Sequence, residues 1–149
     1  MTQQELANSI VHRLLTLLRY RQHVSSQIQK ETNASGRQLA VLRFLVEHNP
    51  SSVGEISAFL YVRDGTTSPL LDRMERDGLV TRTRCRQDAR RVMVVPTPLG
   101  VELAAKAPLS PIARMRADLP KLSVRELQAI DEALQRLSVI ARVDESVLE

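Results

Sequence analysis

One stretch of the chain, residues 53–95, restricts the possible folds more than any other, because two helix signals and two strand signals follow one another within it. Ser52 and Glu55 predict the start of the first helix as a capping box, in which the hydroxyl and the carboxylate each bind a free backbone N–H. The apolar residues of this helix share one face: Val53, Ile56 and Leu60. A polar turn over residues 61–65 leads to a second helix, so the segment predicts a helix-turn-helix.

The second helix and the hairpin after it complete the motif. The inward positions of this helix are apolar: Leu70, Leu71 and Met74. Gly78 can adopt the left-handed conformation that ends the helix, and residues 79–84 and 91–95 are predicted as strands. On the first strand we expect the threonines and arginines to point outward, and on the second the valines to pack inward. Residues 85–90 then form a wing, and the whole predicts a winged helix-turn-helix whose second helix can lie in a DNA major groove.

Composition places the chain among folded, single-domain proteins. It has 149 residues, of which 43% are hydrophobic, and this suits one domain with extensions. No apolar run approaches the ~18 residues of a spanning helix, and the start lacks a signal-peptide pattern, so we expect a cytoplasmic protein without a membrane partner. The single cysteine, Cys85, cannot form an internal disulfide. His12, His23 and His48 lack the paired spacing of a zinc site, so neither a metal nor a cofactor is expected.

Positive charge is concentrated in residues 73–91, although the formal net charge is only +4. This stretch contains seven arginines and three acids: Arg73, Arg76, Arg82, Arg84, Arg86, Arg90 and Arg91, with Glu75, Asp77 and Asp88. Arginine makes bidentate contacts to phosphates and to guanine edges. A basic hairpin is often only a solvated surface; directly after a helix-turn-helix, double-stranded DNA is the favoured partner.

The two ends of the chain predict long amphipathic helices. Residues 3–31 carry apolar side chains at helical spacing, and a capping box at Ser123 and Glu126 opens a second helix with a coiled-coil-like seam. Such helices can pack on their own domain or on a second copy of the chain, and two of them around a small central domain favour the dimer. The predicted interface residues are Ile10, Leu14, Leu127, Ile130, Leu134 and Leu137.

The segments between these parts complete a mainly α fold with a small β-hairpin. Residues 37–48 predict a buried helix that Asn49 and Pro50 stop, and its inward residues are Leu39, Leu42, Leu45 and Val46. Thr97 and Pro98 start a helix that runs to about Lys106. Ser110 and Pro111 restart a helix after a break, and this joint either sets the distance between two lobes of a dimer or, as we favour, is a passive bend. The expected division is 1–34 for dimerisation, 35–100 for DNA binding and 101–149 for dimerisation.

Taken together, the motifs resemble those of the MarR (multiple antibiotic resistance regulator) family of bacterial transcription factors over roughly residues 10–142. The matching segments are Gln38–Leu42, Gly54–Ser57, Leu71–Val80, Asp88–Arg91 and Thr97–Gly100. The resemblance implies a winged-helix homodimer of triangular outline. It further implies a repressor that binds a pseudo-palindromic operator and loses affinity when a small ligand or an oxidant acts.

The resemblance also implies which residues contact DNA. The start of the recognition helix, which reads bases in this family, maps to Thr66, Thr67 and Ser68, while Arg73 is placed for backbone contact. Thr66 and Ser68 alternatively serve only as caps of the first turn. In the wing, Asp88 would orient Arg90 to enter the minor groove or to brace the wing. The position between them, commonly basic in the family, is Ala89, so Arg86 or Arg91 would replace that contact.

A small aromatic or phenolic effector is expected between the dimer helices and the DNA-binding lobe. The candidate contacts follow from position alone, and each can equally be plain core: Leu14, Leu18, Tyr20, Phe44 and Met115. Oxidant-sensing members of the family carry their cysteine near the N-terminal helix, where this chain has none. Cys85 is therefore expected to be an unremarkable wing residue, although the arginines beside it would favour a thiolate.

Two other classes of function compete with that of a DNA-binding regulator. No glycine-rich phosphate loop, nucleophile elbow or paired-carboxylate arrangement supports an enzyme. A winged helix can also serve as a protein-association module. Alternatively, it can keep DNA binding and act as an activator or as an architectural protein without sequence preference. Salt-sensitive DNA binding would distinguish a regulator from a protein-association module. Competition by nonspecific DNA would distinguish a regulator from an architectural protein.

Overall fold

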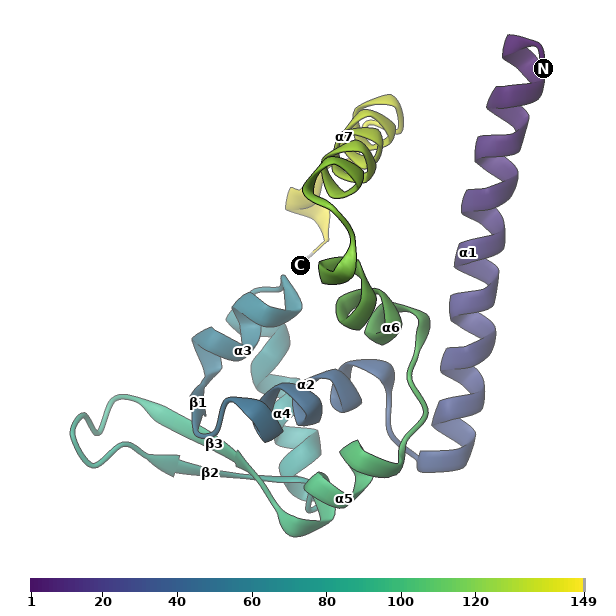
Figure 1. Ribbon diagram of the computed structural model, residues 1–149. Coiled ribbons are helices and arrows are strands. Elements are labelled where there is room, and N and C mark those ends of the chain that lie inside the picture. Colours follow the sequence, from purple (N-terminus) through teal and green to yellow (C-terminus); the bar gives the residue numbers. More distant parts are fainter. Residues whose placement is uncertain (149) are drawn as a thin grey trace.

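The computed structural model describes residues 1–148, which fold into helices around a small three-stranded sheet (Figure 1). The elements, in chain order, are α1 (Gln3–Thr32), α2 (Gly36–Glu47), β1 (Ser51–Ser52), α3 (Val53–Leu60), α4 (Asp64–Arg76), β2 (Val80–Arg84), β3 (Val92–Pro96), α5 (Pro98–Lys106), α6 (Pro111–Asp118), the 3-10 turn η1 (Leu119–Lys121), α7 (Val124–Ile140) and the 3-10 turn η2 (Glu145–Val147). This order confirms the predicted fold class, mainly helical with a winged helix-turn-helix at its centre.

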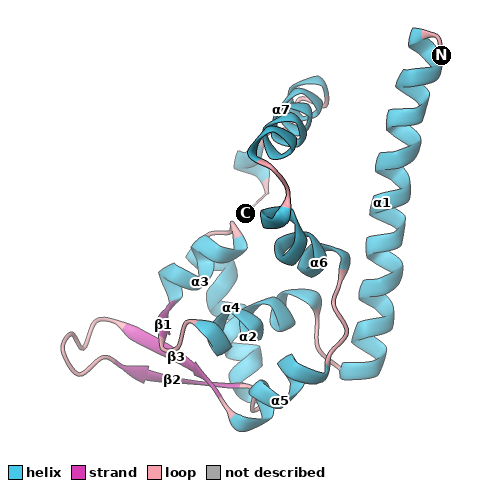
Figure 2. Ribbon diagram, in the orientation of Figure 1, coloured by secondary structure: helices cyan, strands magenta, loops and turns pink. Residues whose placement is uncertain are grey.

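The sheet has the antiparallel order β1-β3-β2 and projects as a hairpin from the body of the molecule (Figure 2). Arg82 on β2 stands opposite Val94 on β3, and Ser51 on β1 pairs with the same valine from the other side. Strand β1 was not predicted, because two serines carry no strand signal of their own. Its pairing makes β3 the central strand and buries Val94 completely.

The hydrophobic core lies between the lower part of α1, helices α2 to α5 and the base of the sheet. Its members are apolar side chains at the positions that face one another across these elements: Ile28, Ala34, Leu39, Val41, Leu42, Leu45, Ile56, Leu71, Met74, Leu79, Val80, Val94 and Ala107. The predicted inward residues of α2 are confirmed except for Val46, which is 48% exposed. It follows Leu45 by one position, and the helix turns it away from the core.

Helix starts follow the capping signals with one correction. Ser35, Thr97, Ser110 and Ser123 each cap a helix with their side chains, as does Ser52, whose hydroxyl accepts from the backbone N–H of Glu55. The predicted capping box at Ser52 is only half formed. The Glu55 carboxylate turns instead toward Arg91, 3.6 Å from its guanidinium.

Gly100 fixes α5 against the loop before β2. A Cβ atom built on Gly100 would lie 2.2 Å from the carbonyl oxygen of Leu79 and 2.9 Å from the Cδ2 atom of Leu42. Only a glycine permits this approach of helix to backbone. Gly78, two residues before β2, has the positive φ of 75° that the sequence predicted for the end of the preceding helix.

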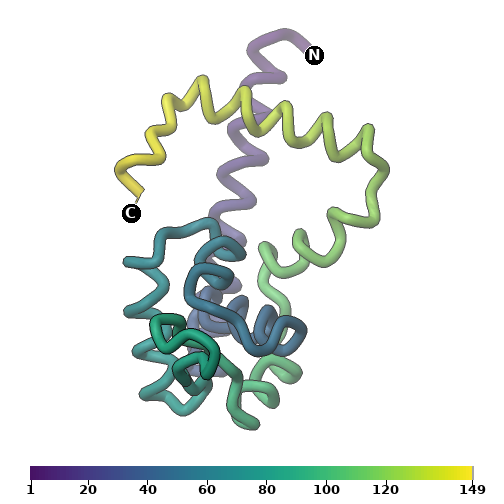
Figure 3. The backbone as a smooth tube through the Cα atoms, turned by 90° about the vertical axis from the view of Figure 1, so that its left-hand side faces the viewer, coloured from purple at the N-terminus to yellow at the C-terminus, as the bar shows by residue number. Residues whose placement is uncertain are grey.

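The outer part of α1 extends away from the core, and α7 runs across above the body without packing into the core (Figures 1 and 3). Helix α7 contains no buried residue, and residues 10–20 of α1 are all exposed. The exposed side chains include Ile10 at 48%, Leu14 at 41%, Ile130 at 41% and Leu134 at 55%, whereas Leu127 and Leu137 are half-buried. Packing of α7 on its own domain is therefore not what the chain adopts. Across residues 1–148, no helix is long and apolar enough to cross a membrane.

Candidate nucleic-acid interface

Helix α4 and the wing lie beside each other, and a shallow depression separates them. We call it the wing hollow; it is lined by Asp64 and Ser68 of α4, by Arg90 and Arg91 of the hairpin, and by the first residues of α3. Three of the predicted DNA contacts, Ser68, Arg90 and Arg91, therefore meet in one place. A recognition helix beside a basic wing can engage a major groove and the adjoining backbone or minor groove together.

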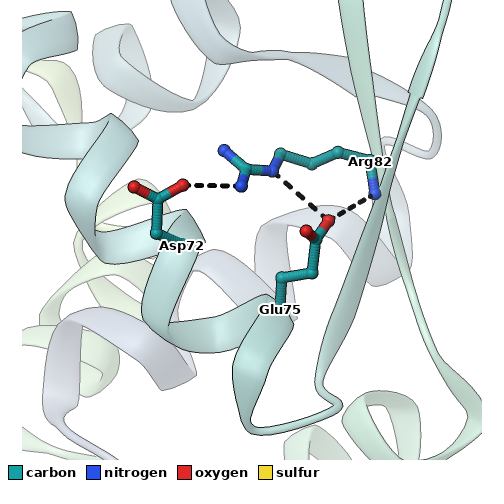
Figure 4. A network of polar contacts seen from close by, with 3 residues as sticks. All are labelled: Asp72, Glu75 and Arg82. Atoms are coloured by element: carbon teal, nitrogen blue, oxygen red, sulfur yellow. Dashed lines mark hydrogen bonds and ion pairs between the residues drawn. The ribbon is translucent and has the colours of Figure 1, made fainter.

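Arg82 braces the hairpin against the recognition helix (Figure 4). Its guanidinium donates to Asp72 Oδ1 at 2.5 Å and to Glu75 Oε2 at 3.3 Å, and its backbone N–H donates to the same Glu75 oxygen at 3.1 Å. These hydrogen bonds, first that of Glu75 and then that of Asp72, raise the pKa of Arg82. The expectation that Arg82 points outward is wrong, since the side chain, only 25% exposed, lies over α4. Arg82 thus links the hairpin directly to the recognition helix.

The wing loop is held by its own backbone and by two side chains. Cys85 N–H donates to the Arg91 carbonyl at 2.8 Å, and Arg84 donates to the Ala89 carbonyl at 2.8 Å. Asp88 accepts from the backbone N–H of Arg90 at 3.0 Å. The expected pair between the Asp88 carboxylate and the Arg90 side chain is not formed in the described part of the chain. Asp88 shapes the loop and leaves the Arg90 guanidinium exposed.

Thr67 does not face the surface. It is fully buried, and its hydroxyl accepts from Ser57 at 2.7 Å and approaches the Arg63 carbonyl at 3.4 Å. The prediction of a base contact is wrong for this residue. Thr67, Leu71 and Met74 stand at i, i+4 and i+7, so the inward face of α4 already includes it. The bond between Ser57 and Thr67 instead joins α3 to α4 inside the helix-turn-helix.

Helix α4 begins one residue before the end of the predicted turn, which ran to Gly65. Asp64 is its first residue, and Arg63 occupies the N-cap position without a side-chain hydrogen bond. Thr66 and Ser68 are thus not N-caps. Ser68 lines the wing hollow, whereas Thr66 and Arg73 line a different cleft on the other side of the helix. The predicted DNA contacts of α4 therefore divide between its two flanks.

This second depression, which we call the arginine cleft, has a volume of about 1190 Å³ and lies between α1, α2, the end of α3, α4 and α6. Five arginines line it: Arg21, Arg37, Arg43, Arg73 and Arg116. Arg43 is engaged, because it donates to the carbonyls of Ala107 and Pro108 at 3.3 and 3.1 Å, and burial lowers its pKa. No other group within residues 1–148 hydrogen-bonds or pairs with the side chains of Arg21, Arg37 and Arg73.

A stack of flat side chains forms one wall of the arginine cleft. The rings of His48 and Phe59 each lie 4.6 Å from the Phe44 ring, nearly parallel to it. The guanidinium of Arg116, on α6, lies 4.0 Å from the centre of the Phe59 ring and donates to the Phe59 carbonyl at 3.0 Å. Arg116 therefore connects α6 to the end of α3.

Of the five expected effector contacts, Phe44 alone lines the arginine cleft. Leu14, Leu18 and Tyr20 lie on the part of α1 that rises away from the body, and Met115 is 38% exposed on α6. Cys85 is a half-exposed free thiol at the base of the wing. Within the described residues, no group of three His, Cys, Asp or Glu side chains is placed to hold a metal ion.

Comparisons with known proteins agree with this architecture. A family model described as MarR family matches residues 33–91. The chain is 35% identical over 105 residues to the organic hydroperoxide resistance transcriptional regulator of Bacillus subtilis (strain 168), and the match covers 70% of each chain. The structure of overoxidized AbfR bound to DNA aligns with a TM-score of 0.63 at 25% identity, over 93% of this chain and 96% of that one. AbsC, a MarR family transcriptional regulator from Streptomyces coelicolor, shares the fold with a TM-score of 0.66 at 23% identity, over 95% of this chain and 97% of that one.

Proposed function

The chain belongs to the MarR family of DNA-binding transcriptional regulators, and on this premise we propose that it is a homodimeric repressor of a pseudo-palindromic operator, released by a small anionic ligand. The observation that carries the proposal is the wing hollow. It joins Ser68 of the recognition helix to Arg90 and Arg91 of a wing that Arg82 links to the same helix. A surface of this kind contacts bases and backbone at the same time.

Each side chain has a proposed role on DNA. Ser68 contacts a base edge, and Arg90 enters the minor groove, where a narrow A/T-rich groove favours an inserted arginine. Arg73, Arg86 and Arg91 contact phosphates. Asp88 acts indirectly, because its hydrogen bond to the Arg90 backbone shapes the loop that presents the guanidinium.

Dimerisation through α1 and α7 supports binding to a palindrome. Four of the six predicted interface residues, Ile10, Leu14, Ile130 and Leu134, have exposed apolar side chains, and a second copy of the chain would remove them from water. A two-fold dimer places two copies of α4 in successive major grooves, about 10 bp apart. Because the dimer presents two identical recognition helices, its operator needs two similar half-sites related by the same two-fold symmetry.

The arginine cleft is the proposed effector site. Arg21, Arg37 and Arg73 offer guanidinium groups to an anion, and Phe44 and Phe59 offer ring faces to an aromatic group. An aromatic carboxylate or a phenolate has both features. Because Arg73 belongs to both the cleft and the DNA-contact set, a bound anion competes with phosphate for the same side chain.

DNA binding tests the proposal directly. The full-length protein is titrated onto the DNA upstream of its own gene at several salt concentrations, with and without excess nonspecific DNA. We expect a competitor-resistant complex at one palindromic site, whose affinity falls steeply with salt. Arg90→Ala should weaken it by about 1–3 kcal/mol, and Arg125→Ala, on the distant helix α7, serves as the matched loss of charge. Binding that competitor removes as readily as the operator would refute a sequence-specific repressor.

A further inference from the structure

Asp64 is an acid at the point of the molecule where a recognition helix reads DNA. It is the first residue of α4, it is exposed, and it stands one helical turn before Ser68 on the same flank. Both residues line the wing hollow with Arg90 and Arg91. The N-terminal residues of a recognition helix are those that contact base edges in the major groove.

The other carboxylates near this surface have partners within the protein. Asp72 and Glu75 bind Arg82, Glu55 lies 3.6 Å from Arg91, and Asp88 accepts from the backbone of Arg90. Asp64 differs from these four, because its carboxylate takes part in no hydrogen bond or ion pair with residues 1–148. The N-cap position before it belongs to Arg63, which makes no side-chain cap.

A free carboxylate in a major groove can bind only donors, since an ionised acid has no proton to give. Phosphates, guanine O6 and N7, and thymine O4 all repel it. The amino groups of cytosine and adenine are the donors in that groove, and adenine carries its acceptor N7 beside the amino group. Cytosine N4 is therefore the base group that best fits a carboxylate.

We propose that Asp64 is a specificity-determining residue, which selects cytosine at one base pair of each half-site by accepting a hydrogen bond from the N4 amino group. This inference rests on the proposed function, because it requires α4 in the major groove. On the far side of the wing hollow, Arg91 contacts phosphate and Arg90 enters the minor groove, so the positive charge of the wing offsets the repulsion between Asp64 and phosphate.

Selection of binding sites from a randomised DNA library tests the proposal with three full-length proteins: the natural sequence, Asp64→Asn and Asp77→Asn. Asp77 ends the same helix at its other end, so its variant is a matched loss of one negative charge. The natural protein should prefer cytosine at one position of each half-site by about fivefold or more. Asp64→Asn should lose this preference and shift toward adenine, because asparagine binds adenine N6 and N7 together. Asp77→Asn should keep the cytosine preference.

The possible results separate this inference from the proposed function. If Asp64→Asn binds every sequence more tightly with an unchanged preference, Asp64 only repels phosphate and the inference is overturned. An unchanged preference with an altered melting temperature would assign Asp64 to the stability of the helix start and would also overturn it. If the natural protein enriches no sequence at all, the proposed function itself fails, and the inference fails with it.

Discussion

The apolar side chains are buried in one part of the molecule and exposed in another. The first part is the winged-helix body, residues 36–106, and the second consists of two arms, residues 3–20 of α1 and helix α7. The body places them in a closed core, with Leu42, Leu45, Ile56 and Met74 fully buried. The arms carry leucines and isoleucines at the same helical spacing, yet no residue of α7 is buried. Periodicity alone therefore does not tell which partner a helix packs on. Stability of the body depends on its own core, whereas in the proposed dimer a second chain buries the apolar side chains of the arms.

The largest expected effect comes from the arms. Leu134→Glu together with Leu137→Glu should raise the dissociation constant of the dimer about 1000-fold or more, since each buried leucine contributes about 1.5–3 kcal/mol and a dimer contains each of them twice. Sedimentation velocity measures the change. Gln128→Glu with Gln135→Glu adds the same number of negative charges to α7 at positions outside the predicted interface and should leave the dimer intact. A dimer that survives the leucine substitutions would show that α7 does not form the interface.

Gly100→Ala is the corresponding change in the body. The new methyl group would meet the Leu79 carbonyl at 2.2 Å, so α5 must move, and we expect the free energy of unfolding to fall by about 3 kcal/mol. Chemical denaturation measures it at fixed protein concentration. Gly36→Ala is the control, because nothing lies within 4 Å of its added Cβ. Equal stability of the two variants would contradict the close packing of α5 on the backbone.

Arg82→Ala should act on DNA binding more than on folding. The substitution frees the wing from α4 and leaves Asp72 and Glu75 as unneutralised charges beside the DNA, so the affinity for an operator should drop by about tenfold. A triple variant that adds Asp72→Asn and Glu75→Gln removes those charges and should regain part of the affinity. Should Arg82→Ala bind as tightly as the natural protein, the brace has no role in recognition.

Arg116→Met should have a smaller effect, because it breaks one link between the body and α6, the helix that leads to the α7 arm. The variant loses a hydrogen bond to the Phe59 carbonyl and a cation–π contact at 4.0 Å, and we expect the free energy of unfolding to fall by about 1 kcal/mol. Arg114→Met changes the same residue type on the same helix and should leave the melting temperature nearly unchanged. The prediction fails if both variants melt alike.

The smallest effect is a pH dependence confined to α7. Hydrogen bonds from the Ser123 hydroxyl and backbone N–H lower the pKa of Glu126. A carboxyl whose pKa is lower in the folded state stabilises that state at neutral pH, and this contribution disappears as the pH falls through the lowered pKa. Glu126→Gln should therefore reduce the loss of helical circular dichroism on acidification, while Glu132→Gln should not. Equal acid sensitivity of the two variants would exclude the capping box as its source.

The fold could be predicted well from the sequence because its signals are local. Capping serines, prolines and apolar periodicity mark most helices, and Gly78 marks the end of the recognition helix. Strand β1 was not predicted, because its two serines form a strand only through their pairing with β3. Such long-range pairing leaves no trace in a two-residue segment.

The candidate site was harder to predict, since motifs identify positions but not the directions of side chains. Thr67 belongs to the inward face of α4, and the spacing to Leu71 and Met74 could have shown it. Arg82 turns toward two acids on a neighbouring element, and the sequence alone gives no sign of which arginine of the strand does so. Asp64 was placed in the turn, although the helix starts there, so its position on the groove side was missed.

Arg116, near the end of α6, attaches this helix to the body shortly before the chain continues through η1 into α7. Helix α7 has 17 residues and therefore extends about 25 Å beyond this attachment. A tilt of about 5° at the base of such a lever displaces its far end by about 2 Å. In a two-fold dimer the same tilt occurs twice, and the two recognition helices move relative to each other while each remains internally rigid. In the proposed dimer, a small change at the Phe59 ring would thus produce a misfit with the fixed repeat of the DNA helix.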